Sequence, residues 1–259
     1  FMRYAAIVEY LGKNYSGFQI QPNVKTIQGC LEDCLSRIAN ESIKIEASGR
    51  TDAGVHALGQ VFHFDTLSVR SINSWVKGTN SFLPDDIKIR WINEVEQDFH
   101  ARFNALKREY QYLLYLNKTK SAIWNDLSGW YSSDLNFSIL DEALYLFKGK
   151  HNFSSYRSSE CQSKKPIKEI YEASYIHKDS FILFKFVADG YLHHQIRNMM
   201  SVILEVASGK KEKDYIDFLF KVKDRTKASN TFLPNGLYLA NIEYDKKFKI
   251  PFLNNKILL

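Results

Sequence analysis

Residues 49–57 of the chain read GRTDAGVHA. Segments rich in β-forming residues flank it at 42–47 and 60–65, so it predicts a short connection between two strands. Its glycines, Gly49 and Gly54, permit a tight backbone path and the close approach of a ligand. Arg50 offers a fork suited to phosphate. Asp52 in such a turn is more often a hydrogen-bonding turn residue than a catalyst, so the stretch alone leaves its role open.

The first hundred residues, which include this stretch, predict the order βαββαβ. Residues 3–10 and 87–95 have strand patterns. Thr26 is the expected N-cap of a helix. The apolar face of that helix consists of Ile27, Leu31, Cys34, Leu35 and Ile38. Ser71 is the expected cap of a second helix. The side chains expected to point inward from the second helix are Ile72, Trp75 and Val76.

The second half of the chain repeats this order. Strands are expected at 107–116 and 237–244, and a hairpin at 167–177 and 181–188. Helices are expected at 136–148, 192–208 and 212–222. The inward face of the first of these helices consists of Ile139, Ala143, Leu144 and Phe147. The repeated order is that of the split-βαβ motif.

We therefore expect an α+β fold built from two split-βαβ halves of ferredoxin or RRM type. The halves are residues 1–105 and 106–259. Their sheets are expected to join into one continuous antiparallel sheet, with helices on one side and a central cleft. No low-complexity segment separates the halves, which predicts one integrated body.

Composition limits the class of protein. The chain has 259 residues, 45% of them hydrophobic and 25% charged, as in an ordinary globular protein. No apolar run is long enough to cross a bilayer, and the N-terminus lacks a signal-peptide pattern. Three cysteines form no disulfide framework, so a cytoplasmic location is expected. The net charge of +6 and the abundant aromatic residues suit an RNA partner, although most rings are expected in the core.

Metal and nucleotide-cofactor motifs are missing from the sequence. Cys30 and Cys34 have no second ligand pair at a zinc-site spacing, and His193-His194 has no acidic or cysteine ligand nearby. The Gly49–Gly54 stretch is not followed by Lys-Ser or Lys-Thr, and no G-x-G-x-x-G opens a helix. We predict no metal and no cofactor.

A second cluster of functional residue types lies at residues 99–112, where the two halves meet. Along the strand from residue 107, the side chains of Arg108, Tyr110 and Tyr112 share one face. Such a face suits a stacked base beside a phosphate. An ordinary solvated edge strand is the alternative.

A third cluster lies at residues 189–200, where a strand ends and a helix begins. His193 and Arg197 are one helical turn apart and share a face. An arginine near a helix N-terminus is electrostatically unfavourable unless an anion lies beside it. The alternative is a surface arginine facing solvent.

Together the three clusters resemble the tRNA pseudouridine synthase A family. Residues 49–57 are similar to the family signature, as are 16–23 and 26–32. Residues 99–112 resemble the segment with the base-stacking tyrosine, and 189–198 the motif with the active-site arginine. Residues 153–156 and 236–239 also match, so the resemblance covers nearly the whole chain.

The resemblance implies that Asp52 is the catalytic carboxylate, that Tyr110 stacks on the target uracil and that Arg197 pairs with Asp52. It implies a homodimer that converts uridine to pseudouridine at positions 38, 39 and 40 of the tRNA anticodon stem-loop. Whether the carboxylate attacks C1′ or C6, or acts as a base, stays open. The side chains expected to contact the substrate are Arg50, Thr51, His56, Arg102, Arg108, Lys164, Lys165 and His193.

One loop departs from the family, and two other functions stay open. Residues 230–234 read NTFLP, in place of the small-residue loop that lies near the active site in the family. The first alternative is a catalytically silent RNA-binding module of the same fold. The second is a small-molecule hydrolase that uses Asp52, His193 and His194.

Overall fold

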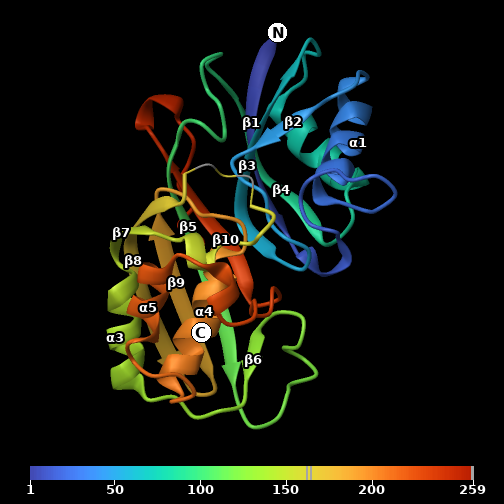
Figure 1. Ribbon diagram of the computed structural model, residues 1–259. Coiled ribbons are helices and arrows are strands. Elements are labelled where there is room, and N and C mark those ends of the chain that lie inside the picture. The colour runs from blue at the N-terminus through green and yellow to red at the C-terminus, as the bar shows by residue number, and fades with distance from the viewer. Residues whose placement is uncertain (162, 164, 258–259) are drawn as a thin grey trace. The chain divides into compact units, whose positions relative to one another are not determined.

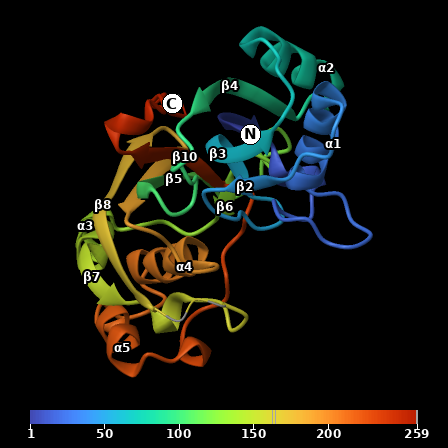
Figure 2. The same cartoon turned by 90° about the horizontal axis from the view of Figure 1, so that it is seen from above.

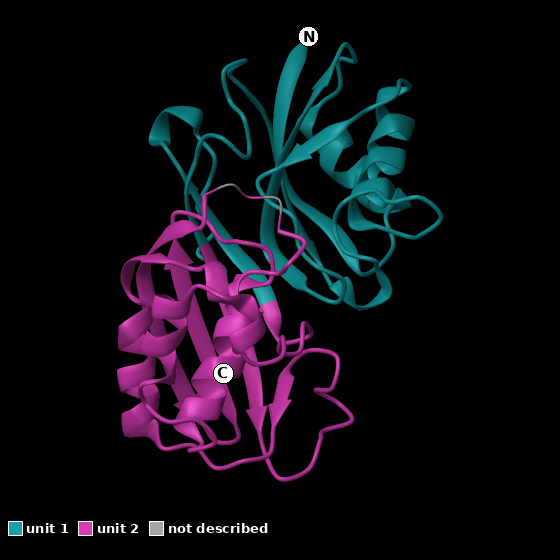
Figure 3. Cartoon of the chain, viewed as in Figure 1, with its two compact units in different colours: residues 1–108, 238–256 teal, residues 109–237, 257–259 magenta. Residues whose placement is uncertain are grey.

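The computed structural model describes residues 1–161, 163 and 165–257 (Figures 1 and 2). The chain forms two compact units (Figure 3). Unit 1 contains residues 1–108 and 238–256, and unit 2 contains residues 109–237 and Ile257. The expected halves divide at 105/106, whereas residues 238–256 belong to unit 1 because strand β10 pairs with β3.

Unit 1 is built on mostly antiparallel strands. They are β1 (Met2–Tyr10), β2 (Ile45–Ala47), β3 (His56–Thr66), β4 (Ile87–Val95) and most of β10 (Leu237–Tyr244). The order is β4-β1-β3-β10, and β2 also pairs with β3. Only the β3–β10 pair of these is parallel. The strands predicted at 3–10 and 87–95 are confirmed.

Helices cover one face of these strands. Helix α1 (Ile27–Ala39) begins as predicted, because the Gly29 N–H donates to Oγ1 of the cap residue Thr26. A π-helical turn (Ser74–Gly78) leads into α2 (Thr79–Phe82) (Figure 2). Trp75 is fully buried, with its ring against Tyr4 and Phe64. These contacts fix the face of β1 and β3 that lies under the helices.

The second helix differs from the prediction at Ile72, whose side chain is 40% exposed. Ser71 does act as a cap, since its Oγ accepts the Ser74 N–H over 3.1 Å. The π-helical turn that follows changes the periodicity of the helix. Trp75 therefore points inward, whereas Val76 is half-buried and Ile72 faces solvent.

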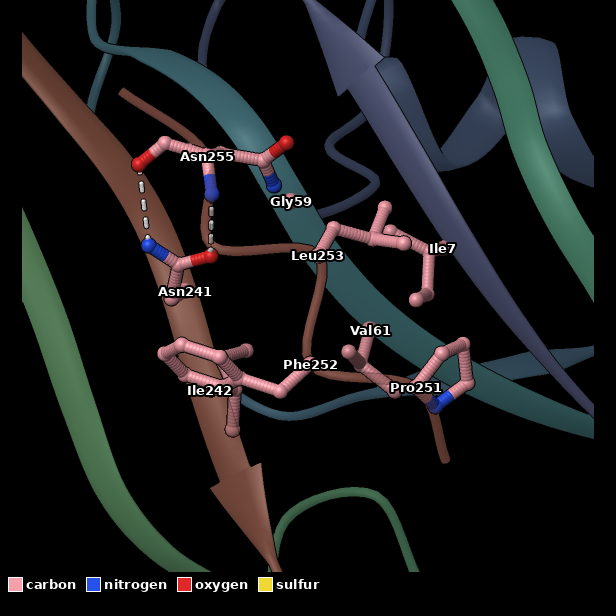
Figure 4. A pocket seen from close by; sticks show the side chains of 9 residues that line it. All are labelled: Ile7, Gly59, Val61, Asn241, Ile242, Pro251, Phe252, Leu253 and Asn255. Atoms are coloured by element: carbon pink, nitrogen blue, oxygen red, sulfur yellow. Dashed lines mark hydrogen bonds between the residues drawn. The ribbon is translucent and has the colours of Figure 1, made fainter. Parts of the chain in front are cut away.

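The C-terminal segment lies against the other face of the unit 1 strands (Figure 4). A small pocket is lined by Ile7 and Val61, which point away from the helices, together with Pro251, Phe252, Leu253 and Asn255. Asn241 and Asn255 hold the segment by two hydrogen bonds: the Asn255 N–H donates to Asn241 Oδ1 (2.9 Å), and Asn241 Nδ2 donates to the Asn255 carbonyl (3.0 Å). No local pattern in the sequence predicts this packing.

Unit 2 has the strand order β5-β9-β8-β7, with β6 parallel to β5. Its strands are most of β5 (Ala105–Leu116), β6 (Gly129–Tyr131), β7 (Gly149–Asn152), β8 (Ile167–Lys178) and β9 (Phe181–Ala188). Its helices are α3 (Phe137–Phe147), α4 (Gln195–Ala207) and α5 (Tyr215–Val222). The β8–β9 hairpin is confirmed, whereas β6 and β7 were not predicted.

Helix α4 is the buried centre of unit 2, and α3 packs against it and against β8. The helix begins three residues later than predicted. His194 has φ of 63°, and the Leu192 N–H donates to Gln195 Oε1, so residues 192–194 form a turn. Helices together with mostly antiparallel strands confirm the α+β class. None of the helices in the described part of the chain is long and apolar enough to cross a membrane.

Candidate active site

Asp52 lies in a tight turn between β2 and β3. The Val55 N–H donates to the Asp52 carbonyl oxygen over 3.1 Å, and Gly54 has φ of 81°. A positive φ at the third position of a turn favours glycine, which accounts for the second glycine of the GRTDAGVHA stretch. The Asp52 side chain is half-buried, so the turn leaves it partly accessible to a ligand.

Thr51 anchors this turn from inside unit 1. Its buried Oγ1 shares a 2.7 Å hydrogen bond with the Tyr10 hydroxyl, and its carbonyl oxygen accepts the Phe18 N–H over 3.0 Å. A Cβ on Gly17 would lie 2.9 Å from that carbonyl oxygen, and Gly17 has φ of 85°. Thr51 was expected to contact the substrate. In this structure its side chain instead bonds to Tyr10 and so holds the backbone next to Asp52 in place.

His56 anchors the other end of the turn and is only 1% exposed. Its Nδ1 accepts the Gly12 N–H over 2.9 Å, and its ring centroid lies 4.7 Å from that of Tyr238. A Cβ on Gly12 would lie 1.9 Å from the Val55 carbonyl oxygen, so only glycine allows this approach. The structure thus gives His56 a supporting position. Gly12 was missed because nothing in its own segment marks it as a neighbour of the turn.

The strand leading into the turn is braced by two polar side chains. Gln60, fully buried, donates from Nε2 to the Gly49 carbonyl oxygen over 2.8 Å. Arg108 donates from Nη2 to the carbonyl oxygens of Ser48 (3.1 Å) and Arg102 (3.0 Å). Arg50 and Arg102 are themselves exposed. Of the three arginines expected to contact the substrate, Arg50 and Arg102 are therefore accessible cations, whereas Arg108 braces the strand.

Tyr110 lies in unit 2 and is nearly buried, with 9% of its surface exposed. Its ring meets the ring of Tyr191 edge-to-face, with centroids 5.2 Å apart and planes at 85°. Such a pair holds a phenol ring in one orientation. Tyr191 belongs to the third sequence cluster, so the structure brings the second and third clusters together within unit 2.

Arg197 lies in the first turn of α4 and is half-buried. Its Nε–H donates to the Phe232 carbonyl oxygen over 2.8 Å. A cation at the positive end of a helix dipole favours a neighbouring anion. Phe232 belongs to the divergent 230–234 loop. Its backbone role was missed, because a carbonyl contact leaves no trace in residue type.

The remaining predicted residues of unit 2 are His193, Lys164 and Lys165. His193 is exposed, and its carbonyl oxygen accepts the Ser158 N–H over 2.9 Å. Its ring lies 4.0 Å from that of His194. Lys165 is exposed, and Lys164 lies outside the described residues. A joint site of Asp52 with Tyr110 and Arg197 stays a prediction.

Comparison with known proteins shows the family. A family model described as tRNA pseudouridine synthase matches residues 6–104 and 143–245, which is more than half of the chain. A tRNA pseudouridine synthase A from Shewanella piezotolerans is 41% identical over 252 residues, 97% of each chain. One from Nitrosomonas eutropha is 41% identical over 253 residues, 98% of this chain and 91% of the relative. The family predicted from the motifs is confirmed: the chain belongs to the tRNA pseudouridine synthases.

Proposed function

We propose that this protein converts uridine to pseudouridine in the anticodon stem-loop of tRNA, at positions 38, 39 and 40, with Asp52 as the catalytic carboxylate. The main observation in support of the proposal is the geometry of the Asp52 turn. Both residues next to the turn, Thr51 and His56, are buried and hydrogen-bonded, while the Asp52 side chain is partly accessible. A fixed carboxylate at a reachable position is what a catalytic group requires.

The reaction explains why one carboxylate without a cofactor suffices. The bond from ribose C1′ to uracil N1 breaks, the uracil turns, and a bond from C1′ to C5 forms. The C5 proton leaves and N1 gains one, so the product is an isomer of the substrate. A carboxylate serves such a reaction as a nucleophile or as a base.

We assign the other groups from the family resemblance and from their positions in each unit. Tyr110, held edge-to-face by Tyr191, would stack on the uracil and keep it in plane while it turns. Arg197 would pair with the Asp52 carboxylate in the tRNA complex and keep it ionised. The exposed Arg50 would contact the backbone and offset the few kcal/mol that flipping a nucleotide costs.

The test is Asp52→Asn, assayed by pseudouridine formation in an anticodon stem-loop RNA. We expect the rate to fall by at least about 10³-fold, the order of loss when a catalytic group is removed. Asp33→Asn, an exposed aspartate of α1, is the matched control and should keep the wild-type rate. A wild-type rate for Asp52→Asn would contradict the proposal. Tight RNA binding without product by the wild-type protein would favour the silent RNA-binding module.

Three broader features belong to the same proposal. Each half of the chain, residues 1–105 with Asp52 and residues 106–259 with Tyr110, is built on the split-βαβ order. The order β4-β1-β3, with β2 on β3, supports this in unit 1.

The enzyme works as a homodimer, which a measurement of its mass in solution tests. It works in the cytoplasm, in keeping with its three free cysteines.

A further inference from the structure

Arg225 is a half-buried arginine whose guanidinium forms hydrogen bonds to the loop that follows it. Its Nη1 donates to the carbonyl oxygens of Ala228 (3.3 Å) and Ser229 (2.9 Å). Its Nη2 donates to Asn198 Oδ1 (3.1 Å) and Thr231 Oγ1 (3.3 Å). Four hydrogen bonds from one side chain thus tie the 228–231 loop to helix α4.

The same loop is fixed to α4 at two successive positions. Thr231 Oγ1 donates to Asn198 Oδ1 over 2.8 Å. One residue on, the Phe232 carbonyl accepts the Arg197 Nε–H over 2.8 Å, and the Phe232 N–H donates to the Arg197 carbonyl over 3.3 Å. Asn198 and Arg197, which are adjacent in α4, therefore bind Thr231 and Phe232, which are adjacent in the loop.

We propose that Arg225 is a positioning residue for Arg197: it fixes the loop whose Phe232 carbonyl orients the Arg197 guanidinium. The proposal rests on the proposed function, because it takes Arg197 as a group of the active site. A guanidinium is planar, so a bond that fixes Nε also fixes the plane of its two terminal nitrogens. The orientation of that plane determines whether the guanidinium can form a bidentate hydrogen bond with a carboxylate or phosphate.

The shape of the arginine fork, more than its charge, explains why this position holds an arginine. The four acceptors of Arg225 are two carbonyls, an amide oxygen and a hydroxyl, all uncharged. A lysine would keep the positive charge, but its single nitrogen has three donors and cannot reproduce four hydrogen bonds from two separate nitrogens. Arg225→Lys therefore removes the bracing geometry while it preserves the charge.

The kinetic experiment measures single-turnover pseudouridine formation and RNA affinity for Arg225→Lys. We expect the rate constant to fall by about 10- to 100-fold, the effect of a misplaced site group, with the RNA Kd within about threefold of wild type. Arg70→Lys is the matched control, since Arg70 also donates to backbone carbonyls, those of Ile38 in the last turn of α1 and of Val69, in unit 1. It should keep the wild-type rate. A wild-type rate constant for Arg225→Lys would overturn the proposal.

A double-mutant cycle tests whether Arg225 acts through Arg197. In an Arg197→Lys background, Arg225→Lys should lower the rate constant further by less than about twofold, because the group it orients is already gone. Independent effects that multiply would overturn the proposal. If Arg197→Lys alone keeps the wild-type rate, the assignment of Arg197 to the active site fails.

An NMR measurement decides the positioning role without using activity. The Arg197 Nε–H signal, identified by its loss in Arg197→Lys, should exchange slowly with solvent in the wild-type protein. In Arg225→Lys its exchange should be at least about tenfold faster, since the Phe232 carbonyl is no longer held in place. An unchanged exchange rate would overturn the proposal whatever the kinetic results.

Discussion

At the scale of single residues, the pKa of His63 predicts how the stability of the protein changes with pH. Burial, together with the positive charges of Arg3 and His100, lowers the pKa of His63 from 6.5 to about 4. Its Nδ1 accepts the Ala101 N–H over 3.2 Å, a bond that only the neutral ring can accept. Since the unfolded chain binds this proton more readily, the stabilisation is complete above pH 6.5 and is lost as pH falls towards 4.

We expect the free energy of unfolding to fall by about 1–3 kcal/mol between pH 6.5 and 4 because of this residue. Urea denaturation of the wild-type protein and of His63→Gln across this range measures the effect, and the variant should show the smaller pH dependence. His177→Gln, at an exposed histidine of β8, should retain the wild-type pH dependence. Equal pH dependence in His63→Gln and wild type would show that another group is responsible.

At the scale of elements, the loop after β1 supports the Asp52 turn. Gly12→Ala would place a Cβ 1.9 Å from the Val55 carbonyl oxygen and separate the loop from His56. We expect a loss of about 1–3 kcal/mol in the free energy of unfolding, as for other overpacked sites. We also expect at least about a tenfold slower reaction, because Asp52 shifts with the turn. Chemical denaturation and the stem-loop assay measure the two effects.

Gly49→Ala is the control for this substitution within the same motif. A Cβ at Gly49 meets no atom within 4 Å, and its backbone does not have a positive φ. The rate and the stability should stay close to wild type. If the two alanine variants behave alike, the loop around Gly12 does not control the position of Asp52.

How much the sequence could predict depends on whether a contact is local. The cap at Thr26 and the β8–β9 hairpin follow from nearby residue types, and both are confirmed. Strand β6 has three residues, too few for a hydrophobic period, and it was missed. Around the site, the residue types left the role of Asp52 open, and the family resemblance indicated it. The Phe232 carbonyl and the Gly12 N–H were missed because backbone groups are the same in every residue.

At the scale of the whole molecule, unit 1 is assembled from both ends of the chain. Strand β10 pairs with β3, and the C-terminal segment returns across the same strands (Figure 4). Asn255 Nδ2 donates to the carbonyl oxygens of Leu58 and Ala240, each over 3.1 Å. Together with its two bonds to Asn241, this side chain and its backbone connect three separated segments. Pairing over about two hundred residues has no local signature, so it could not be predicted.

Asn255→Ala tests whether this connection stabilises unit 1. The substitution removes the donor to two backbone carbonyls and leaves them without that partner, which costs about 1–3 kcal/mol. Urea denaturation should show this loss, and hydrogen exchange should show faster opening of β10 than in the wild-type protein. Lys256→Ala changes the exposed neighbour and should leave both measurements unchanged. If the free energy of unfolding of Asn255→Ala equals that of Lys256→Ala, the C-terminal segment packs on unit 1 without stabilising it. The pairing of β10 with β3 then holds this part of the chain in unit 1 without help from Asn255.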